Sequence, residues 1–120
     1  MKHPEHDIHC AIVNYLRLNK VFCFAVPNGG LRNLKTAVFL KKEGATAGVS
    51  DLIILLKNKC VFVEIKTKTG RQSEEQKVFQ QAVELLGFEY HIWRSLDDAI
   101  KFVREEGLRG IVFSSPLNIV

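Results

Sequence analysis

The sequence predicts an α/β fold in which helices flank a central mixed β-sheet. A continuous apolar run and an alternating β-branched run, separated by a polar turn, indicate a hairpin of antiparallel strands over 52–67. A helix-patterned segment then leads to a further strand-patterned segment, as in a crossover to a parallel strand. The 120 residues match the length of one domain and contain no linker or repeat. We therefore expect a single domain over residues 1–120.

Composition excludes several protein classes. Apolar residues make up 47% and charged residues 25% of the chain, both close to the globular average, so disordered and collagen-like classes are excluded. No apolar run approaches the ~18–20 residues of a membrane span, and the polar N-terminus has no signal-peptide pattern. Three widely spaced cysteines are typical of reduced thiols. We expect a cytoplasmic protein with no membrane partner.

The first helix is expected over 4–19. Pro4 suits its first turn, and apolar residues from Ile8 to Leu16 recur at helical spacing. Glu5 lies three residues before Ile8, on the same stripe that faces the core. A carboxylate at the inner edge of an apolar face is unusual, so Glu5 is a candidate functional residue. The alternative is a simple charge at the helix N-terminus.

The middle of the chain is predicted from alternating runs and breaks. The expected elements are a strand over 21–26, a turn over 27–30, a short helix over 36–43, a loop over 44–48 and strands over 52–56 and 60–67.

A capping box opens the next helix, because Ser73 is followed three residues later by Gln76. The helix is expected to end at Gly87. Its expected buried residues are Val78, Phe79, Ala82, Val83 and Leu86. A strand over 88–93 and a last helix, which begins at Ser95 or Asp97 and ends at Gly107, complete the prediction. Residues 108–120 are either an edge strand or a dimerisation tail.

Charged residues on the second hairpin strand are the most informative feature. Glu64 and Lys66 are two positions apart, so they share one face, while the intervening and flanking apolar residues point into the core. Two-residue turns give two possible registers: Asp51 lies opposite Glu64 or opposite Lys66. Either register places these three side chains within reach of one another. A plain surface ion pair between Glu64 and Lys66 is the alternative.

Two neighbouring carboxylates repel, and one takes up a proton unless a cation cancels the charge. Hard oxygen ligands favour Mg²⁺ or Mn²⁺ over zinc, and Mg²⁺ commonly bridges carboxylates to a substrate phosphate. A lysine beside the ion can orient water and stabilise charge. The three residues therefore predict a metal-dependent site for phosphodiester hydrolysis.

The segment from Gly48 through Asp51 and Leu52, followed by Glu64-Ile65-Lys66, resembles the PD-(D/E)xK nuclease motif. Within that superfamily the chain most resembles the small stand-alone form of the virus-type replication-repair nuclease (VRR-NUC) domain. Glu5, the turn at 27–30 and Gln76 extend the resemblance over roughly residues 4–103. One departure is Ser50, where the family usually has proline before the aspartate. It loosens the loop but removes no ligand.

The resemblance implies a restriction-endonuclease-like core and a role for each matching residue. Asp51 and Glu64 would bind the metal, together with the main-chain carbonyl of Ile65. Lys66 would assist the water, and Glu5 would complete the site or hold a metal-bound water. Gln76 would orient Lys66 or the substrate phosphate; its alternative role is as the capping partner of Ser73 alone.

The resemblance also implies a structure-specific DNA endonuclease in repair, recombination or replication. Its substrates would be branched DNA such as Holliday junctions or flaps, and the setting a bacterial or phage-infected cell. A homodimer is expected, because two symmetric cuts need two sites. The alternatives are a non-catalytic DNA-binding module of the same fold, a less structure-selective nuclease or exonuclease, and a protein-interaction domain that uses the C-terminal tail.

Basic residues gather in the middle of the chain, which has a net charge of +4 overall. The segment from Arg32 to Arg71 contains nine Lys and Arg residues but only three acidic residues. Such a surface attracts an anionic polymer, although a solvated basic surface is the alternative. The candidate DNA contacts are Asn28, Arg32, Lys35, Lys68 and Arg71.

Overall fold

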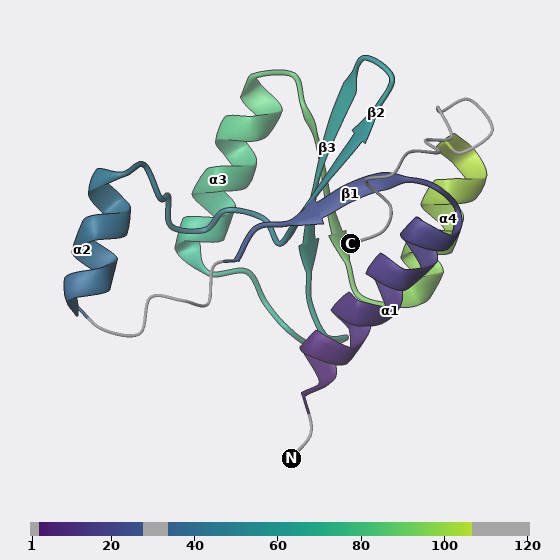
Figure 1. The fold of residues 1–120 in the computed structure, drawn as a ribbon, viewed down its shortest axis with the longest axis horizontal. Coiled ribbons are helices and arrows are strands. Elements are labelled where there is room, and N and C mark those ends of the chain that lie inside the picture. Colours follow the sequence, from purple (N-terminus) through teal and green to yellow (C-terminus); the bar gives the residue numbers. More distant parts are fainter. Residues whose placement is uncertain (1–2, 28–33, 107–120) are drawn as a thin grey trace.

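A four-stranded sheet lies at the centre of the structure, a computed structural model that describes residues 3–27 and 34–106. Its strands lie in the order β1-β2-β3-β4 (Figure 1). They are β1 (Phe22–Ala25), β2 (Leu52–Leu56), β3 (Lys59–Ile65) and β4 (Glu89–Trp93). Antiparallel pairs join β1 to β2 and β2 to β3, whereas β3 and β4 are parallel. The predicted mixed sheet is confirmed.

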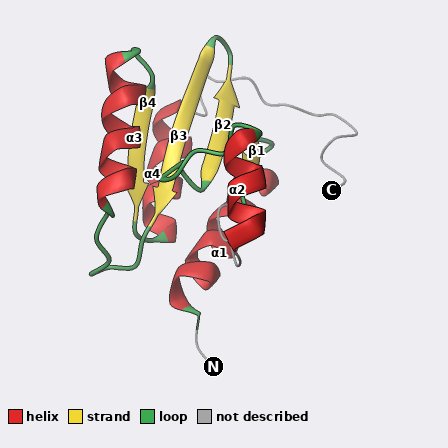
Figure 2. Ribbon diagram, turned by 90° about the vertical axis from the view of Figure 1, so that its left-hand side faces the viewer, coloured by secondary structure: helices red, strands yellow, loops and turns green. Residues whose placement is uncertain are grey.

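Helices cover both faces of this sheet. They are α1 (Pro4–Leu18), α2 (Leu34–Lys42), α3 (Glu74–Leu85) and α4 (Leu96–Glu106). α3 makes the crossover between β3 and β4 and lies on one face, while α1 and α4 lie together on the other (Figure 2). α2 stands apart from the sheet, beyond α3 (Figure 1). Each described helix begins and ends within two residues of its expected bounds.

The hairpin register is set by a two-residue loop of Lys57 and Asn58. Leu52 pairs with Val63, and Leu56 pairs with Lys59. Asn58 has a φ of 59°, a left-handed conformation that asparagine tolerates better than most residues. Of the two registers that the sequence allows, this one places Asp51 opposite Glu64.

The main core lies between the sheet and the pair α1 and α4. Its side chains come from alternate positions of the strands and from the inner stripes of both helices. Its members are Ile12, Leu16, Val21, Cys23, Leu52, Ile54, Val61, Val63, Ile65, Trp93, Ala99 and Phe102. Since these residues occupy one face of β3, Glu64 is left on the opposite face, toward α3.

The α3 face holds a smaller aromatic cluster. The ring centroids of Phe62 and Phe79 lie 5.7 Å apart, and those of Phe79 and Tyr90 lie 6.4 Å apart. Val83, one helical turn after Phe79, is also buried. α3 thus meets the sheet along a narrow i, i+4 stripe.

The predicted burial of three α3 residues was wrong. Val78, Ala82 and Leu86 are exposed, with Leu86 at 75%. The apolar pattern spans a wider arc than the single sheet face that α3 covers, so only the stripe of Phe79 and Val83 turns inward.

No helix in 3–27 or 34–106 is long and apolar enough to cross a membrane. Most of the predicted turn over 27–30 and the proposed edge strand or tail over 108–120 lie outside the described residues.

Candidate functional site

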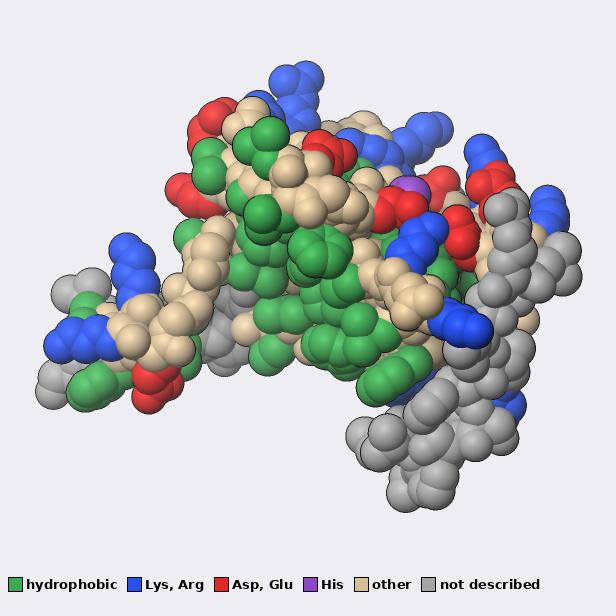
Figure 3. All heavy atoms as spheres, turned by 90° about the horizontal axis from the view of Figure 1, so that it is seen from above, with side chains coloured by type: hydrophobic (Ala, Val, Ile, Leu, Met, Phe, Trp, Pro, Cys, Tyr) green, Lys and Arg blue, Asp and Glu red, His purple; other side chains and the backbone are tan. Residues whose placement is uncertain are grey.

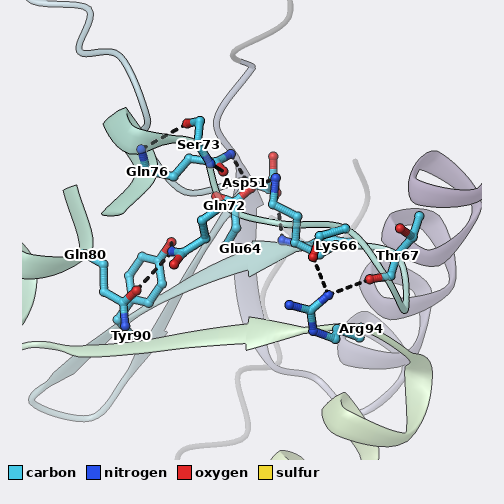
Figure 4. Close-up of polar contacts among 12 residues, drawn as sticks. Asp51, Glu64, Lys66, Thr67, Gln72, Ser73, Gln76, Gln80, Tyr90 and Arg94 are labelled. Carbon is cyan, nitrogen blue, oxygen red and sulfur yellow. Dashed lines mark hydrogen bonds and ion pairs between the residues drawn. The ribbon is translucent and has the colours of Figure 1, made fainter. Parts of the chain in front are cut away.

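Glu64 is the centre of the candidate site, because it is a carboxylate with only 1% of its surface exposed. It lies near the end of β3, on the face toward α3 (Figure 4). Its Oε2 accepts a hydrogen bond from Gln76 Nε2 at 2.9 Å. Its Oε1 is buried and has no hydrogen-bond partner among the described residues. A buried carboxylate oxygen without a donor is costly, and this one indicates that a cationic ligand or a proton is needed there.

Asp51 faces Glu64 from the start of the hairpin. Its Oδ2 accepts a hydrogen bond of 2.8 Å from the main-chain N–H of Ile65, on the neighbouring strand. The hydrogen bond ties the residue before β2 to the end of β3, so the carboxylate is held by the sheet rather than by a free loop. The two side chains that the sequence placed within reach are therefore adjacent.

Burial, together with the neighbouring carboxyl of Asp51, raises the pKa of Glu64 to about 8. Burial is the largest cause, followed by the negative charge of Asp51 and a hydrogen bond between the two carboxyls. Glu5 also raises the pKa, and the positive charge of Lys66 lowers it. Without a cation, the pair is therefore most stable when it shares one proton.

Gln76 has two roles at once. Its side-chain Oε1 accepts from the main-chain N–H of Ser73 at 2.8 Å, and its main-chain N–H donates to Ser73 Oγ at 3.2 Å. These two hydrogen bonds complete the predicted capping box. Because the amide oxygen is used by the cap, the NH₂ group is directed toward Glu64. The capping interaction and the contact with the site are therefore one arrangement, and the contact is with Glu64 rather than Lys66.

Lys66 lies beside the pair. Its Nζ is 3.8 Å from Glu64 Oε2, and its side chain is 12% exposed. Its main-chain N–H donates to the carbonyl of Trp93 at 3.0 Å, which continues the β3–β4 pairing one residue past the strand. A nearly buried ammonium beside two carboxylates is positioned to stabilise negative charge that enters the site.

A cleft of about 240 Å³ opens above these side chains. Asp51, Glu64 and Gln76 line it, together with Glu5 from the first turn of α1. The structure thus brings Glu5 to the site that the sequence assigned to it. Glu75 also lines the cleft, and the sequence analysis missed it. Its position directly before Gln76, in the same first turn of α3, was the available signal.

The loop before β2 fits closely against α3. Gly48 has a φ of +82°, and a Cβ there would overlap the main-chain carbonyl of Glu75 and lie 2.7 Å from the nitrogen of Gln76. Only glycine allows this approach. Ser50 is fully buried, and its Oγ donates to the carbonyl of Leu52 at 3.4 Å. Serine therefore holds the loop with a hydrogen bond.

The donor set fits a hard divalent cation. Asp51 and Glu64 offer carboxylate oxygens, and one of these is buried without a partner. No group of three His, Cys, Asp or Glu side chains in the described part of the chain is arranged to hold a metal by itself. Two carboxylates with main-chain and water ligands are typical of Mg²⁺, which keeps several waters, and Mn²⁺ accepts the same ligands.

Two of the candidate DNA-contact residues lie near the site. Lys68 and Arg71 are exposed on the turn that follows β3. Lys35 belongs to α2, and its side chain is not described. Asn28 and Arg32 lie outside the described residues. Lys68 and Arg71 are therefore available to a partner two and five residues after Lys66, and the structure does not describe the side chains of the other three.

Gly48→Ala is expected to destabilise the protein more than Gly44→Ala. Both glycines have a positive φ, so both substitutions carry left-handed strain of about 1–2 kcal/mol. A Cβ at Gly44 meets nothing within 4 Å, whereas one at Gly48 overlaps α3 and adds about 1–3 kcal/mol. Urea unfolding of both variants measures the difference. Equal midpoints would contradict the close fit.

The metal-free protein is expected to lose stability as pH rises toward 8. The folded pKa of Glu64, about 8, lies above its ordinary value of 4.5, so folding takes up a proton between these values. The contribution is complete below about pH 4.5 and is lost as pH rises through 8. Its slope is at most about 1.4 kcal/mol per pH unit. Thermal unfolding in EDTA at several pH values, compared with Glu64→Gln, measures it; parallel curves would refute it.

Comparisons with known proteins agree on the fold. No family model matches the sequence, and no curated protein matches it. A solved structure described as a VRR_NUC domain protein superposes with a TM-score of 0.70 and 18% identity, over 88% of each chain. Another, described as a VRR_NUC domain, gives a TM-score of 0.64 and 14% identity, over 86% of this chain and 97% of that one. The chain therefore has the same fold as these VRR_NUC domain structures.

Proposed function

We propose that the chain is one nuclease domain, a metal-dependent endonuclease that hydrolyses phosphodiester bonds in branched DNA and leaves 3′-OH and 5′-phosphate ends. The observation that carries the proposal is the buried Glu64 opposite the half-buried Asp51: one Glu64 oxygen has no hydrogen-bond partner among the described residues, and the other lies 3.8 Å from the Lys66 ammonium. A module that only binds DNA has no need of clustered carboxylates next to phosphates, since they repel the backbone. The VRR_NUC-like fold supports the same assignment.

In this proposal, Asp51 and Glu64 hold Mg²⁺ or Mn²⁺ with the main-chain carbonyl of Ile65. When bound, the ion supplies positive charge that polarises the phosphate and activates water. Gln76 fixes the orientation of the Glu64 carboxylate through its hydrogen bond. Lys66 stabilises the charge that develops on the phosphate and helps to orient the water.

Glu5 stands at the edge of the proposed site. It lines the cleft from α1 and is exposed, so it can hold a water of the metal without replacing a ligand. Glu75 lines the cleft from α3, where its main chain packs against Gly48. The negative charge of Glu5 also acts on Glu64, and this added negative potential favours the binding of a divalent cation.

DNA is proposed to approach across the exposed turn after β3. Lys68 and Arg71 lie on this turn, two and five residues after Lys66, and offer cations to the phosphate backbone. Asn28, Arg32 and Lys35 remain candidates for further contacts. We propose that the protein acts in the cytoplasm of a bacterial or phage-infected cell, which agrees with its three free cysteines.

Asp51→Asn, Glu64→Gln and Lys66→Ala are each expected to reduce the cleavage rate at least ~10³-fold, because each removes charge that acts at the reacting phosphate. Binding to a four-way junction is expected to remain, since Lys68 and Arg71 supply the proposed contacts with the rest of the phosphate backbone. Labelled junction, flap and linear duplex with Mn²⁺, Mg²⁺ or EDTA measure both properties. Lys101→Ala, an exposed lysine on α4, serves as the control.

The same assay separates the alternatives. Cleavage by all three variants at the wild-type rate would place the active site elsewhere. Junction binding without cleavage in either metal would favour the non-catalytic DNA-binding module. Cleavage of the linear duplex from its ends, with no preference for branches, would favour the exonuclease or the less selective nuclease.

A homodimer is proposed to form through the part of the α3 face that α3 does not cover. Phe24 and Leu55 lie there, 41% and 40% exposed, on the β1–β2 side of the sheet. Figure 3 shows hydrophobic side chains gathered over the middle of one face of the molecule. Such patches typically mark interaction surfaces. A second copy is the partner that symmetric cleavage of a junction requires.

Phe24→Glu is expected to convert the dimer to a monomer, because a charge in an apolar interface costs several kcal/mol. The variant is expected to nick a junction but to lose coordinated cutting of both strands. Sedimentation equilibrium and a cruciform plasmid assay measure the two effects. Leu18→Glu, at an exposed position of α1, is the control. A wild-type monomer at micromolar concentration would contradict the proposal.

A further inference from the structure

We propose that Arg94 is a positioning residue that fixes the turn after Lys66 and thereby holds the Lys66 ammonium at the site. The inference rests on the proposed function of Lys66. Arg94 follows β4 directly, twenty-eight positions along the chain from the lysine that it is inferred to control. It does not line the cleft, so its effect is exerted through the turn rather than on the phosphate.

The guanidinium of Arg94 donates hydrogen bonds to several carbonyls of a single turn. Nη1 of Arg94 donates to the carbonyl of Thr67 at 2.7 Å and to that of Gly70 at 2.7 Å, with a longer contact of 3.4 Å to Lys68 (Figure 4). The turn is closed by the N–H of Gly70, which donates to Thr67 at 3.2 Å. Hydrogen bonds from a charged donor are stronger than neutral ones, so one side chain sets the shape of the turn.

This turn packs directly on the stem of Lys66. A Cβ at Gly70 would lie 3.5 Å from Cδ of Lys66 and 3.0 Å from Oγ1 of Thr67. Gly70 therefore lies next to the aliphatic part of the lysine side chain, and the charged end of this lysine lies beside Glu64. A displaced turn would release this stem and give the ammonium rotamers that point to solvent.

Arg94 is itself held in place at the junction of β4 and α4. Its main-chain N–H donates to Oδ2 of Asp98 at 2.8 Å, and the N–H of Asp98 donates to the carbonyl of Ser95 at 3.2 Å. The residue before it, Trp93, accepts the main-chain N–H of Lys66. Consecutive residues thus anchor the backbone of Lys66 and the turn that covers its side chain.

The far end of the same connection has a separate anchor. Nε2 of Gln72 lies 3.0 Å from Oε1 of Gln80 and 3.2 Å from the hydroxyl of Tyr90. The exposed Lys68 and Arg71 stand between the two anchors. Loss of the Gln72 anchor leaves the turn at 67–70 intact, so Gln72→Ala is a matched control for the specific role of Arg94.

The first test reads the position of Lys66 without any reaction on DNA. Purified full-length protein is treated with a limiting amine-reactive ester, and labelling of each lysine is measured by mass spectrometry. Arg94→Ala is expected to raise labelling of Lys66 at least threefold, with Arg94→Lys intermediate, because lysine keeps the charge but lacks the rigid planar guanidinium. Gln72→Ala and Arg104→Ala, an exposed arginine on α4, are expected to leave Lys66 labelling unchanged.

The second test measures single-turnover cleavage of a junction with Mn²⁺, together with Mn²⁺ affinity and the melting temperature. Arg94→Ala is expected to lower the rate at least tenfold, with Mn²⁺ affinity unchanged. Guanidinium ion at millimolar concentration is expected to restore part of the rate. Unchanged Lys66 labelling would overturn the inference, as would a rate loss matched by equal loss of Mn²⁺ affinity. If the wild type does not cleave, the proposed function fails, and the labelling result alone decides the role of Arg94.

Discussion

The burial of the Glu64 carboxylate opposite a second, half-buried carboxylate, Asp51, is the constraint on which the rest of the structure depends. Asp51 and Glu64 stand opposite one another because the hairpin closes with two residues, and the Ile65 N–H fixes Asp51. A pair of this kind has a high free energy when both members are ionised. The surroundings reduce that free energy only in part: Gln76 donates to one oxygen of Glu64, and another oxygen is left without a donor. The unpartnered oxygen of Glu64 is therefore a place where a proton or a cationic ligand would lower the free energy of the pair.

Three connections converge to hold this pair, and each uses a different physical device. The loop before β2 uses glycine to approach α3 at Gly48. The start of α3 uses a capping box, in which Gln76 serves the helix and the site at once. The turn after β3 is held by hydrogen bonds from the Arg94 guanidinium to its main-chain carbonyls. Such support from outside the reacting groups is what keeps catalytic side chains within a small range of positions.

The strand patterns predicted the site because side-chain direction in a strand alternates with period two. That periodicity placed Glu64 and Lys66 on one face and allowed two registers, and the position of the turn, at Lys57 and Asn58, then selected one of them. The helix pattern was less informative, since α3 has apolar residues over a wide arc and only Phe79 and Val83 meet the sheet. Glu75 was not predicted for a related reason: its place in the first turn of α3 beside Gln76 was a signal, but the sequence does not show which loop packs against that turn.

The sequence by itself determined the order of the elements, the mixed sheet and the shared face of the two carboxylates, because these follow from local periodicity and from turn and cap signals. Only the tertiary structure decided which side of α3 is buried, that Glu5 reaches the cleft from α1, and that Arg94 meets the turn beside Lys66. These are contacts between segments distant in the chain. Their geometry depends on how whole elements pack, and no local pattern of residues encodes it.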